Sequence, residues 1–273
     1  MQKKQNKRRV PRRGILISAA VLILSLVILA AFLWKRDDDS VAAMAGIDYL
    51  EQLEQKDPAA VKEVLSEQRR QQMRQQCEAL LEQLRSGEKD VWSFFEDYVI
   101  LGDSRAVGFY YFDYLEQSRV LASGGDTILS VAHHQEEIKA MAPSYIFLCY
   151  GLNDVSIGYW KTPEEYIAEY LRALEQLRQQ LPQATVIVSS ILPARDPAFE
   201  RSERWRNIPA YNTALEQMCR ENGIPYVNND QICEQNPSLW QPDGIHVRQE
   251  FYPLWASNLV VAMLESTMEE DGA

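Results

Sequence analysis

Short apolar runs alternate with longer segments of mixed polarity from about residue 98 to residue 268. The apolar runs, which end in turn residues, predict buried strands at residues 98–101, 119–122, 145–150, 185–191 and 224–227. The segments between them predict helices at residues 106–117, 128–141, 163–180, 209–222 and 249–268. Strands that alternate with helices of this length form a parallel sheet that is covered on both faces. The pattern therefore predicts an α/β fold.

Residues 41–90 precede the first strand and are rich in Gln, Glu, Arg, Leu and Ala. Asp57-Pro58 is typical of a helix start, and Gly87 is expected to end that helix. Apolar positions recur at roughly helical spacing, but they do not sustain a heptad pattern. The sequence therefore favours a stalk helix that packs partly on the domain over a long coiled coil.

Residues 14–34 are uncharged and apolar. At about 1.5 Å per residue, a helix of this length spans roughly 30 Å, the thickness of one hydrocarbon core. A cleaved signal peptide is the alternative, because Ala43-Met44-Ala45 resembles a cleavage site. The apolar run is too long for a signal peptide, and residues 35–39 are all charged and separate it from that site, so we favour an uncleaved transmembrane signal-anchor.

Charge is unevenly distributed along the chain. Seven of the 28 basic side chains lie in residues 1–13, so the remainder has 21 bases against 39 acids and a net charge of −18. The basic tail predicts a cytoplasmic N-terminus, and the rest of the chain then lies outside the membrane. An acidic domain of this kind repels nucleic acid. We expect a basic tail at 1–13, a membrane helix at 14–34, a helical stalk at 35–90 and one extracytoplasmic catalytic domain at 91–273.

The strand predicted at residues 98–101 stops at Gly102-Asp103-Ser104. A sharp turn at this point can present a serine at the carboxyl edge of the sheet, where open α/β sheets bind ligands. Taken alone, Gly-Asp-Ser is explained slightly better as a helix cap. A serine hydroxyl is also a weak nucleophile unless a base takes its proton.

The chain contains three histidines, of which His246 is the best candidate for that base. His133 and His134 fall in a predicted helix away from any strand end, which favours surface positions for both. His246 lies in the polar turn Asp243-Gly244-Ile245-His246. An aspartate three residues earlier can reach Nδ1 of the histidine and leave Nε2 to face a serine. Ser104, His246 and Asp243 are therefore the candidate catalytic triad.

Acyl transfer also needs hydrogen-bond donors for a developing oxyanion. Gly125 follows the second predicted strand, and Asn153 follows the third within Gly151-Leu152-Asn153-Asp154. Each residue alone is explained better as an ordinary turn residue. Together with Ser104 and His246, they form a specific set at successive strand ends.

These four motifs resemble the blocks of the SGNH/GDSL hydrolase family. The similarity covers about residues 95–265, and the sequence after Ser104 is similar to membrane-anchored Gram-positive members. The resemblance implies a flavodoxin-like three-layer α/β/α sandwich with a parallel five-stranded sheet and no cofactor. It also implies Ser104 as nucleophile, His246 as base and Asp243 as its orienting group. The amides of Ser104 and Gly125 and the side chain of Asn153 would form the oxyanion hole, with Gly124 as the alternative to Gly125.

We therefore expect a membrane-anchored serine esterase. An outward-facing enzyme beside a cell wall meets acylated glycans, so the predicted substrate is an acylated carbohydrate or small ester. The loops near the motifs are polar, which favours a short acyl group such as acetyl over a long chain. An O-acyltransferase with the same triad and a catalytically silent wall-binding module are the alternatives.

The four cysteines, Cys77, Cys149, Cys219 and Cys233, match no metal-binding spacing. Cys149 lies in an apolar run and is expected to be buried. Cys219 and Cys233 flank the last predicted strand, and we expect that they can form a disulfide outside the membrane, with two unpaired buried thiols as the alternative.

Overall fold

The computed structural model of the protein describes residues 58–270. The chain divides into two compact units between Arg70 and Gln71, within helix α2 (Pro58–Arg85). The predicted cytoplasmic tail and membrane helix lie outside the described residues, and both stay predictions. Within the described range, no helix has the length and apolar character that a membrane span requires.

Five strands of the described chain form one parallel sheet in the order β2-β1-β3-β4-β5. Their bounds are Tyr98–Gly102 for β1, Val120–Ala122 for β2, Tyr145–Cys149 for β3, Thr185–Ser189 for β4 and Tyr226–Val227 for β5. The order is that of flavodoxin-like folds, in which ligands bind at the carboxyl edge of the sheet. The predicted α/β fold with a parallel five-stranded sheet is confirmed.

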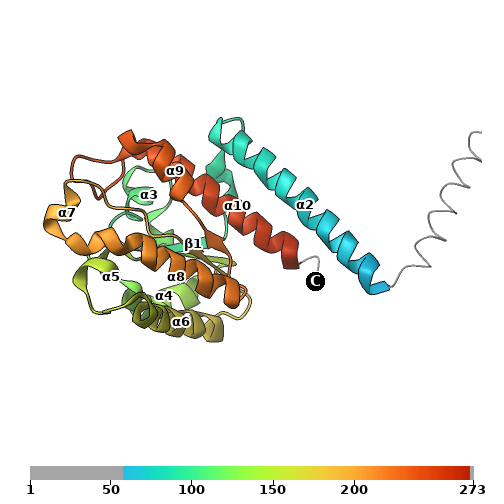
Figure 1. The fold of residues 1–273 in the computed structure, drawn as a ribbon, viewed down its shortest axis with the longest axis horizontal. Helices are drawn as coiled ribbons and strands as arrows, with labels where there is room; N and C mark the ends of the chain where they lie inside the picture. The colour runs from blue at the N-terminus through green and yellow to red at the C-terminus, as the bar shows by residue number, and fades with distance from the viewer. Residues whose placement is uncertain (1–57, 271–273) are drawn as a thin grey trace, which may run out of the picture. The chain divides into compact units, whose positions relative to one another are not determined.

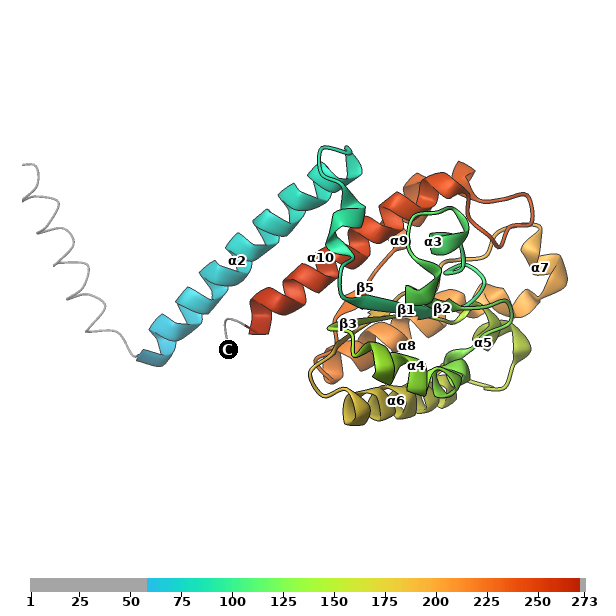
Figure 2. The same cartoon turned by 180° about the vertical axis from the view of Figure 1, so that it is seen from behind.

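Helices cover both faces of this sheet (Figures 1 and 2). The α-helices after α2 are α3 (Gly108–Tyr111), α4 (Gln135–Met141), α5 (Leu152–Ile157), α6 (Pro163–Gln180), α7 (Ala198–Arg201), α8 (Ile208–Glu221), α9 (Asp230–Gln235) and α10 (Tyr252–Glu270). The 3₁₀ helices are Val91–Phe94, Gln117–Arg119, Ile128–His133, Glu203–Asn207, Pro237–Leu239 and Gln249–Phe251.

Successive strand residues point to opposite faces and build two cores. Val99 and Leu101 join one core, which also contains residues of α4, α5, α6 and α8. Ile100 and Phe147 join the other, which contains residues of α3, α9, α10 and the end of α2. Every residue of β1 is buried because both faces of the sheet are covered. Buried strands of this kind explain the apolar runs in the sequence.

Local signals located several helix ends correctly. Helix α6 begins at Pro163, and the Thr162 hydroxyl accepts the amide N–H of Glu165 at 3.4 Å. Helix α2 ends at Arg85, two residues before Gly87, which has a φ of +75°. Gly223 follows α8 with a φ of +60°.

The helix predicted at residues 106–117 is largely wrong, because only α3 is α-helical in that stretch. Asp113 adopts a left-handed conformation with φ +59°, and the amides of Tyr114 and Leu115 both donate to the carbonyl of Phe109. These bonds turn the chain back and end the helix. The segments after β3 and β4 also contain two short helices that were not predicted, α5 and α7.

The disulfide expected between Cys219 and Cys233 is also wrong. All four cysteines lie in the described range, and each is buried and unpaired. Cys219 packs in the core on one face of the sheet, whereas Cys233 packs in the core on the other face. The sheet therefore separates two thiols that are close in sequence.

Candidate active site

The turn after β1 presents Ser104 at the carboxyl edge of the sheet. The strand end requires Gly102, because a Cβ there would lie 2.5 Å from the Cβ of Ala106. The buried carboxylate of Asp103 closes the turn by accepting the amide N–H of Arg105 at 3.0 Å. Ser104 is partly exposed, so its hydroxyl can reach a bound ester.

A buried ion pair lies behind this turn. Arg105 is 3% exposed, and its Nε lies 3.6 Å from Oδ1 of Asp103. Its Nη1 donates to the carbonyl oxygen of Leu192, and its own carbonyl accepts the Tyr252 hydroxyl at 2.8 Å. A buried charge is costly unless it is paired and hydrogen-bonded, and Arg105 meets both conditions. The pair ties the turn of Ser104 to the segment after β4 and to α10.

The predicted triad residues Ser104, His246 and Asp243 lie in one hydrogen-bonded chain. Nε2 of His246 lies 3.1 Å from the hydroxyl oxygen of Ser104, and Nδ1 lies 2.6 Å from Oδ2 of Asp243. Because an ionised carboxylate only accepts hydrogen bonds, we assign the imidazole proton to Nδ1. Nε2 then accepts the serine O–H, so the neutral imidazole can take that proton.

The carboxyl group of Asp243 is stabilised in its ionised form. Partial burial raises its pKa, but hydrogen bonds from the His246 ring and from the amides of Ile245 and His246 outweigh that effect, and the pKa lies below its usual value. The two amides lie 2.9 and 3.0 Å from Oδ1, which leaves Oδ2 for the imidazole. The carboxylate can thus orient the ring and stabilise an imidazolium.

Backbone contacts hold the loop that carries Asp243 and His246. The amide of Gln241 donates to the carbonyl of His246 at 2.8 Å, and the amide of Arg195 donates to the carbonyl of Gly244 at 2.8 Å. Gly244 has a φ of +69°, and a Cβ there would lie 2.2 Å from the carbonyl oxygen of Arg195. The close approach of the segment after β4 therefore requires glycine in this loop.

The predicted oxyanion-hole residues, Gly125 and Asn153, follow the strands on either side of β1. Gly102 pairs in register with Ala122 of β2 and with Cys149 of β3. These three paired residues lie at the carboxyl ends of their strands. Within four residues after them come Ser104, Gly125 and Asn153, so the topology brings the three turns to one edge of the sheet.

The side chain of Asn153 contacts the loop that carries Gly125. Its Nδ2 donates to the carbonyl oxygen of Asp126 at 2.8 Å. The amide nitrogen carries two hydrogens, so one is left for a second acceptor. Gly125 has a φ of +89°, and it is therefore the residue of the Gly124-Gly125 pair whose backbone favours glycine.

The two other histidines lie at the surface, as predicted. His133 is exposed, and Nδ1 of His134 lies 2.9 Å from a carboxylate oxygen of Glu137. Neither ring forms a hydrogen bond with a triad residue in the described part of the chain, and His246 is thus the histidine beside Ser104.

Three residues around the site were not predicted from the sequence. Arg105 pairs with Asp103, Asp154 binds the loop after β2, and the buried Trp205 donates from Nε1 to the carbonyl oxygen of Leu152 at 2.8 Å. Trp205 is 7% exposed and packs within its own domain. Arg105 and Asp154 adjoin motif residues, whereas no local signal marks Trp205.

The family model of the GDSL-like lipases and acylhydrolases matches residues 100–253, which include all four motifs. The chain belongs to this family. It is accordingly a carboxylic ester hydrolase. A search of curated proteins finds no match for this acylhydrolase.

Solved structures support the fold of the acylhydrolase. A protein of Bacteroides fragilis NCTC 9343, assigned as an acylhydrolase, is 19% identical, with 63% of this chain and 87% of that chain covered and a TM-score of 0.51. The lipase/acylhydrolase from Enterococcus faecalis is 18% identical, with 60% of this chain and 94% of that chain covered and a TM-score of 0.50. At these identities the likeness shows a shared fold.

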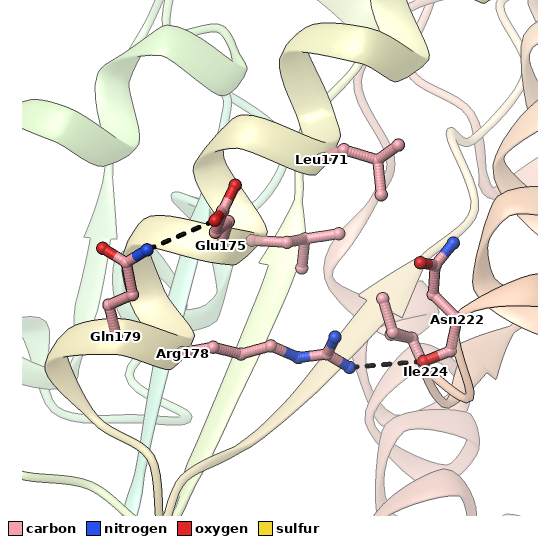
Figure 3. A pocket seen from close by; sticks show the side chains of 7 residues that line it. Leu171, Glu175, Arg178, Gln179, Asn222 and Ile224 are labelled. Carbon is pink, nitrogen blue, oxygen red and sulfur yellow. Dashed lines mark hydrogen bonds between the residues drawn. The ribbon is translucent and has the colours of Figure 1, made fainter.

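A hollow of about 410 Å³ in the acylhydrolase lies between α6 and the turn before β5 (Figure 3). Leu171 and Ile224 line it, and Arg178 donates across it to the carbonyl oxygen of Asn222 at 3.4 Å. The C-terminal half of α6 lies at the amino edge of the sheet, because the helix leads back to the start of β4. The hollow is thus separate from the edge that carries Ser104.

Proposed function

We propose that the protein is a serine esterase that works through an acyl-enzyme. The observation that carries this proposal is the hydrogen-bonded chain from Ser104 through His246 to Asp243. His246 takes the proton as the Ser104 oxygen attacks the ester carbonyl, and it then gives that proton to the leaving alcohol. Water attacks the acyl-enzyme in the second half-reaction, with His246 again acting as the base.

The proposed oxyanion hole consists of the amides of Ser104 and Gly125 and the Nδ2 group of Asn153. Charge on the carbonyl oxygen develops only as the tetrahedral intermediate forms, so fixed donors at this position stabilise the transition state. The contact of Asn153 with the loop of Gly125 supports this assignment, because it keeps the two donors in adjacent segments.

The proposed substrate is a short-chain, acetylated carbohydrate. Residues 200–204, in the segment after β4, carry two glutamates and two arginines, and most of this stretch is exposed. Such charges remain hydrated beside a glycan, whereas burial under a long acyl chain would be costly. Tyr159 is 63% exposed and packs edge-on against Trp160, so it offers an aromatic surface on which a sugar ring can stack.

The proposed location is the outer face of a cell membrane, in the manner of membrane-anchored Gram-positive relatives. The apolar run at residues 14–34 and the basic residues before it support this proposal. Alkaline extraction of membranes from cells that express the full chain tests it, together with protease accessibility of the catalytic domain in intact cells.

The esterase proposal is tested with the full chain on nitrophenyl acetate and on acetylated glycans. We expect release of acetate by the native protein and a loss of at least about 10³-fold in kcat for Ser104→Ala. Ser86→Ala is the matched control, because it removes an exposed serine hydroxyl outside the triad and outside the segments proposed to contact the glycan. Equal activity of native protein and Ser104→Ala would refute the proposal.

A further inference from the structure

Two consecutive residues of α5 bind the loop after β2 at two points. Nδ2 of Asn153 donates to the carbonyl oxygen of Asp126, and Oδ1 of Asp154 accepts the amide N–H of Ile128 at 2.9 Å. Asp126 lies in the loop directly after Gly125, and Ile128, two positions later, begins the next 3₁₀ helix. Two hydrogen bonds therefore hold the loop that carries Gly125 against helix α5, one to a backbone carbonyl and one from a backbone amide.

Asp154 does not face the substrate. Its side chain is completely buried in the core that contains Val155 and Ile128. The next residue toward the N-terminus, Asn153, is partly exposed and carries the proposed oxyanion donor. The side chain of Asn153 can therefore reach a bound ester, whereas the buried side chain of Asp154 can only hold the loop in place.

The surroundings of Asp154 favour a neutral carboxyl group. Its second oxygen, Oδ2, is buried without a hydrogen-bond partner in the described chain, as are the hydroxyl groups of Tyr150, Tyr166 and Tyr170 in the same core. Burial is also the main reason why the pKa of Asp154 is raised to about 7. A neutral carboxyl group still accepts the Ile128 amide through Oδ1, so the contact with the loop does not depend on charge.

We propose that Asp154 is a positioning residue of the oxyanion hole, which holds the amide of Gly125 at its working distance from Asn153 through the hydrogen bond to Ile128. The inference rests on the proposed serine-esterase function. A displacement of about 1 Å in such a donor costs up to about 100-fold in rate, because the donor acts on charge that develops in the transition state. The same donor contributes much less to binding of the ester in the ground state.

The test compares Asp154→Ala, Asp154→Ser and Asp154→Asn in the full chain. The alanine and serine variants lose the acceptor that reaches Ile128, and we expect kcat to fall by about 10- to 100-fold with KM within about threefold. The inhibition constant of a trifluoromethyl ketone, which forms an oxyanion adduct with the serine, should rise by a similar factor. Asp154→Asn keeps an oxygen acceptor, so it should restore kcat to within about threefold.

Asn229→Ala is the matched control. Asn229 is buried, and its Nδ2 donates to the hydroxyl oxygens of Ser189, the last residue of β4, and of Ser190, the next residue, at 3.0 and 3.2 Å. Its loss should lower the Tm but leave kcat and the ketone inhibition constant unchanged. The control therefore separates loss of a buried polar contact from loss of oxyanion geometry.

Folded Asp154→Ala or Asp154→Ser protein with kcat within twofold of native would overturn the proposal. An equal loss of kcat in Asn229→Ala, or failure of both Asp154 variants to fold, would assign Asp154 a purely structural role and would also overturn it. A failure of the esterase proposal itself is distinguishable, because it would appear as activity that survives Ser104→Ala.

Discussion

The carboxylate of Asp103 accepts the amide N–H of Leu152 at 3.1 Å and so joins the turn that carries Ser104 to the helix that carries Asn153. The same carboxylate accepts the amide of Arg105 through its other oxygen. The proposed nucleophile and one proposed oxyanion donor are therefore connected by a single buried side chain. Rigid connections of this kind keep catalytic groups in a fixed geometry without any cost during the reaction.

Asp103→Asn is expected to reduce both stability and turnover. An amide has one acceptor oxygen, so the variant cannot serve both the Leu152 and Arg105 amides, and the buried Arg105 guanidinium loses its counter-charge. We expect a loss of about 3 kcal/mol in the free energy of unfolding, measured in urea, and at least about tenfold in kcat.

The control for this variant is Glu169→Gln, which removes one partner of the exposed pair between Glu169 and Arg172. Its free energy of unfolding should change by less than about 0.5 kcal/mol. Equal stability of Asp103→Asn and native protein would contradict a structural role for the buried pair.

Asn153→Ala is expected to lower kcat by about 100-fold or more, with the fold intact, because it removes one oxyanion donor. Ser104→Ala should be more damaging still. Steady-state kinetics on a good ester substrate measure both effects, and circular dichroism checks the fold. Full turnover by Asn153→Ala would exclude its side chain from the oxyanion hole.

Stability should fall as the pH rises from about 4 to 7 because of Asp154. Burial raises its pKa from 3.8 to about 7 in the folded protein, so the folded state binds the proton more tightly than the unfolded state. The protonated carboxyl group stabilises the folded state fully below about pH 4. This contribution to the free energy of unfolding falls as the pH rises to the pKa of the folded state, and the loss is on the order of 4 kcal/mol by pH 8.

Urea unfolding at pH 5, 6, 7 and 8 tests this effect by comparing native protein with Asp154→Asn. The neutral amide does not titrate, so the variant should gain stability relative to native protein as the pH increases. Parallel pH curves for the two proteins would show that Asp154 ionises normally.

Short acyl groups should be preferred. We expect kcat/KM to decrease from acetyl to butyryl to octanoyl esters of one leaving group, because the polar segments beside the site offer little apolar surface to a chain. A steady increase in kcat/KM with chain length would contradict the acetyl-ester proposal.

The four cysteines should be unreactive in the folded protein. Each is buried, and burial raises the thiol pKa of Cys149, Cys219 and Cys233. A thiol reagent should label none of them at neutral pH under native conditions, and it should label all four after unfolding in urea. Mass spectrometry of non-reduced peptides that showed a bridge between Cys219 and Cys233 would refute the separation of these two residues by the sheet.

The sequence by itself determined the α/β class, the strands and the candidate catalytic residues. Strands of a parallel sheet are buried on both faces, so they leave continuous apolar runs that can be recognised locally. The chemistry follows directly after these runs, and Ser104, Asn153 and the Asp243-to-His246 turn could therefore be identified from their positions at strand ends. The short spacing of Asp243 and His246 also made their contact predictable.

Only the tertiary structure decided which residues support that site. Asp103 reaches Leu152 across 49 positions, Arg105 reaches Leu192 across 87, and Trp205 reaches Leu152 across 53. No local pattern encodes such contacts, because they depend on which strands are neighbours and on which face each helix packs. The separation of Cys219 from Cys233 has the same cause, since a short distance along the chain does not determine the face of the sheet on which a side chain lies.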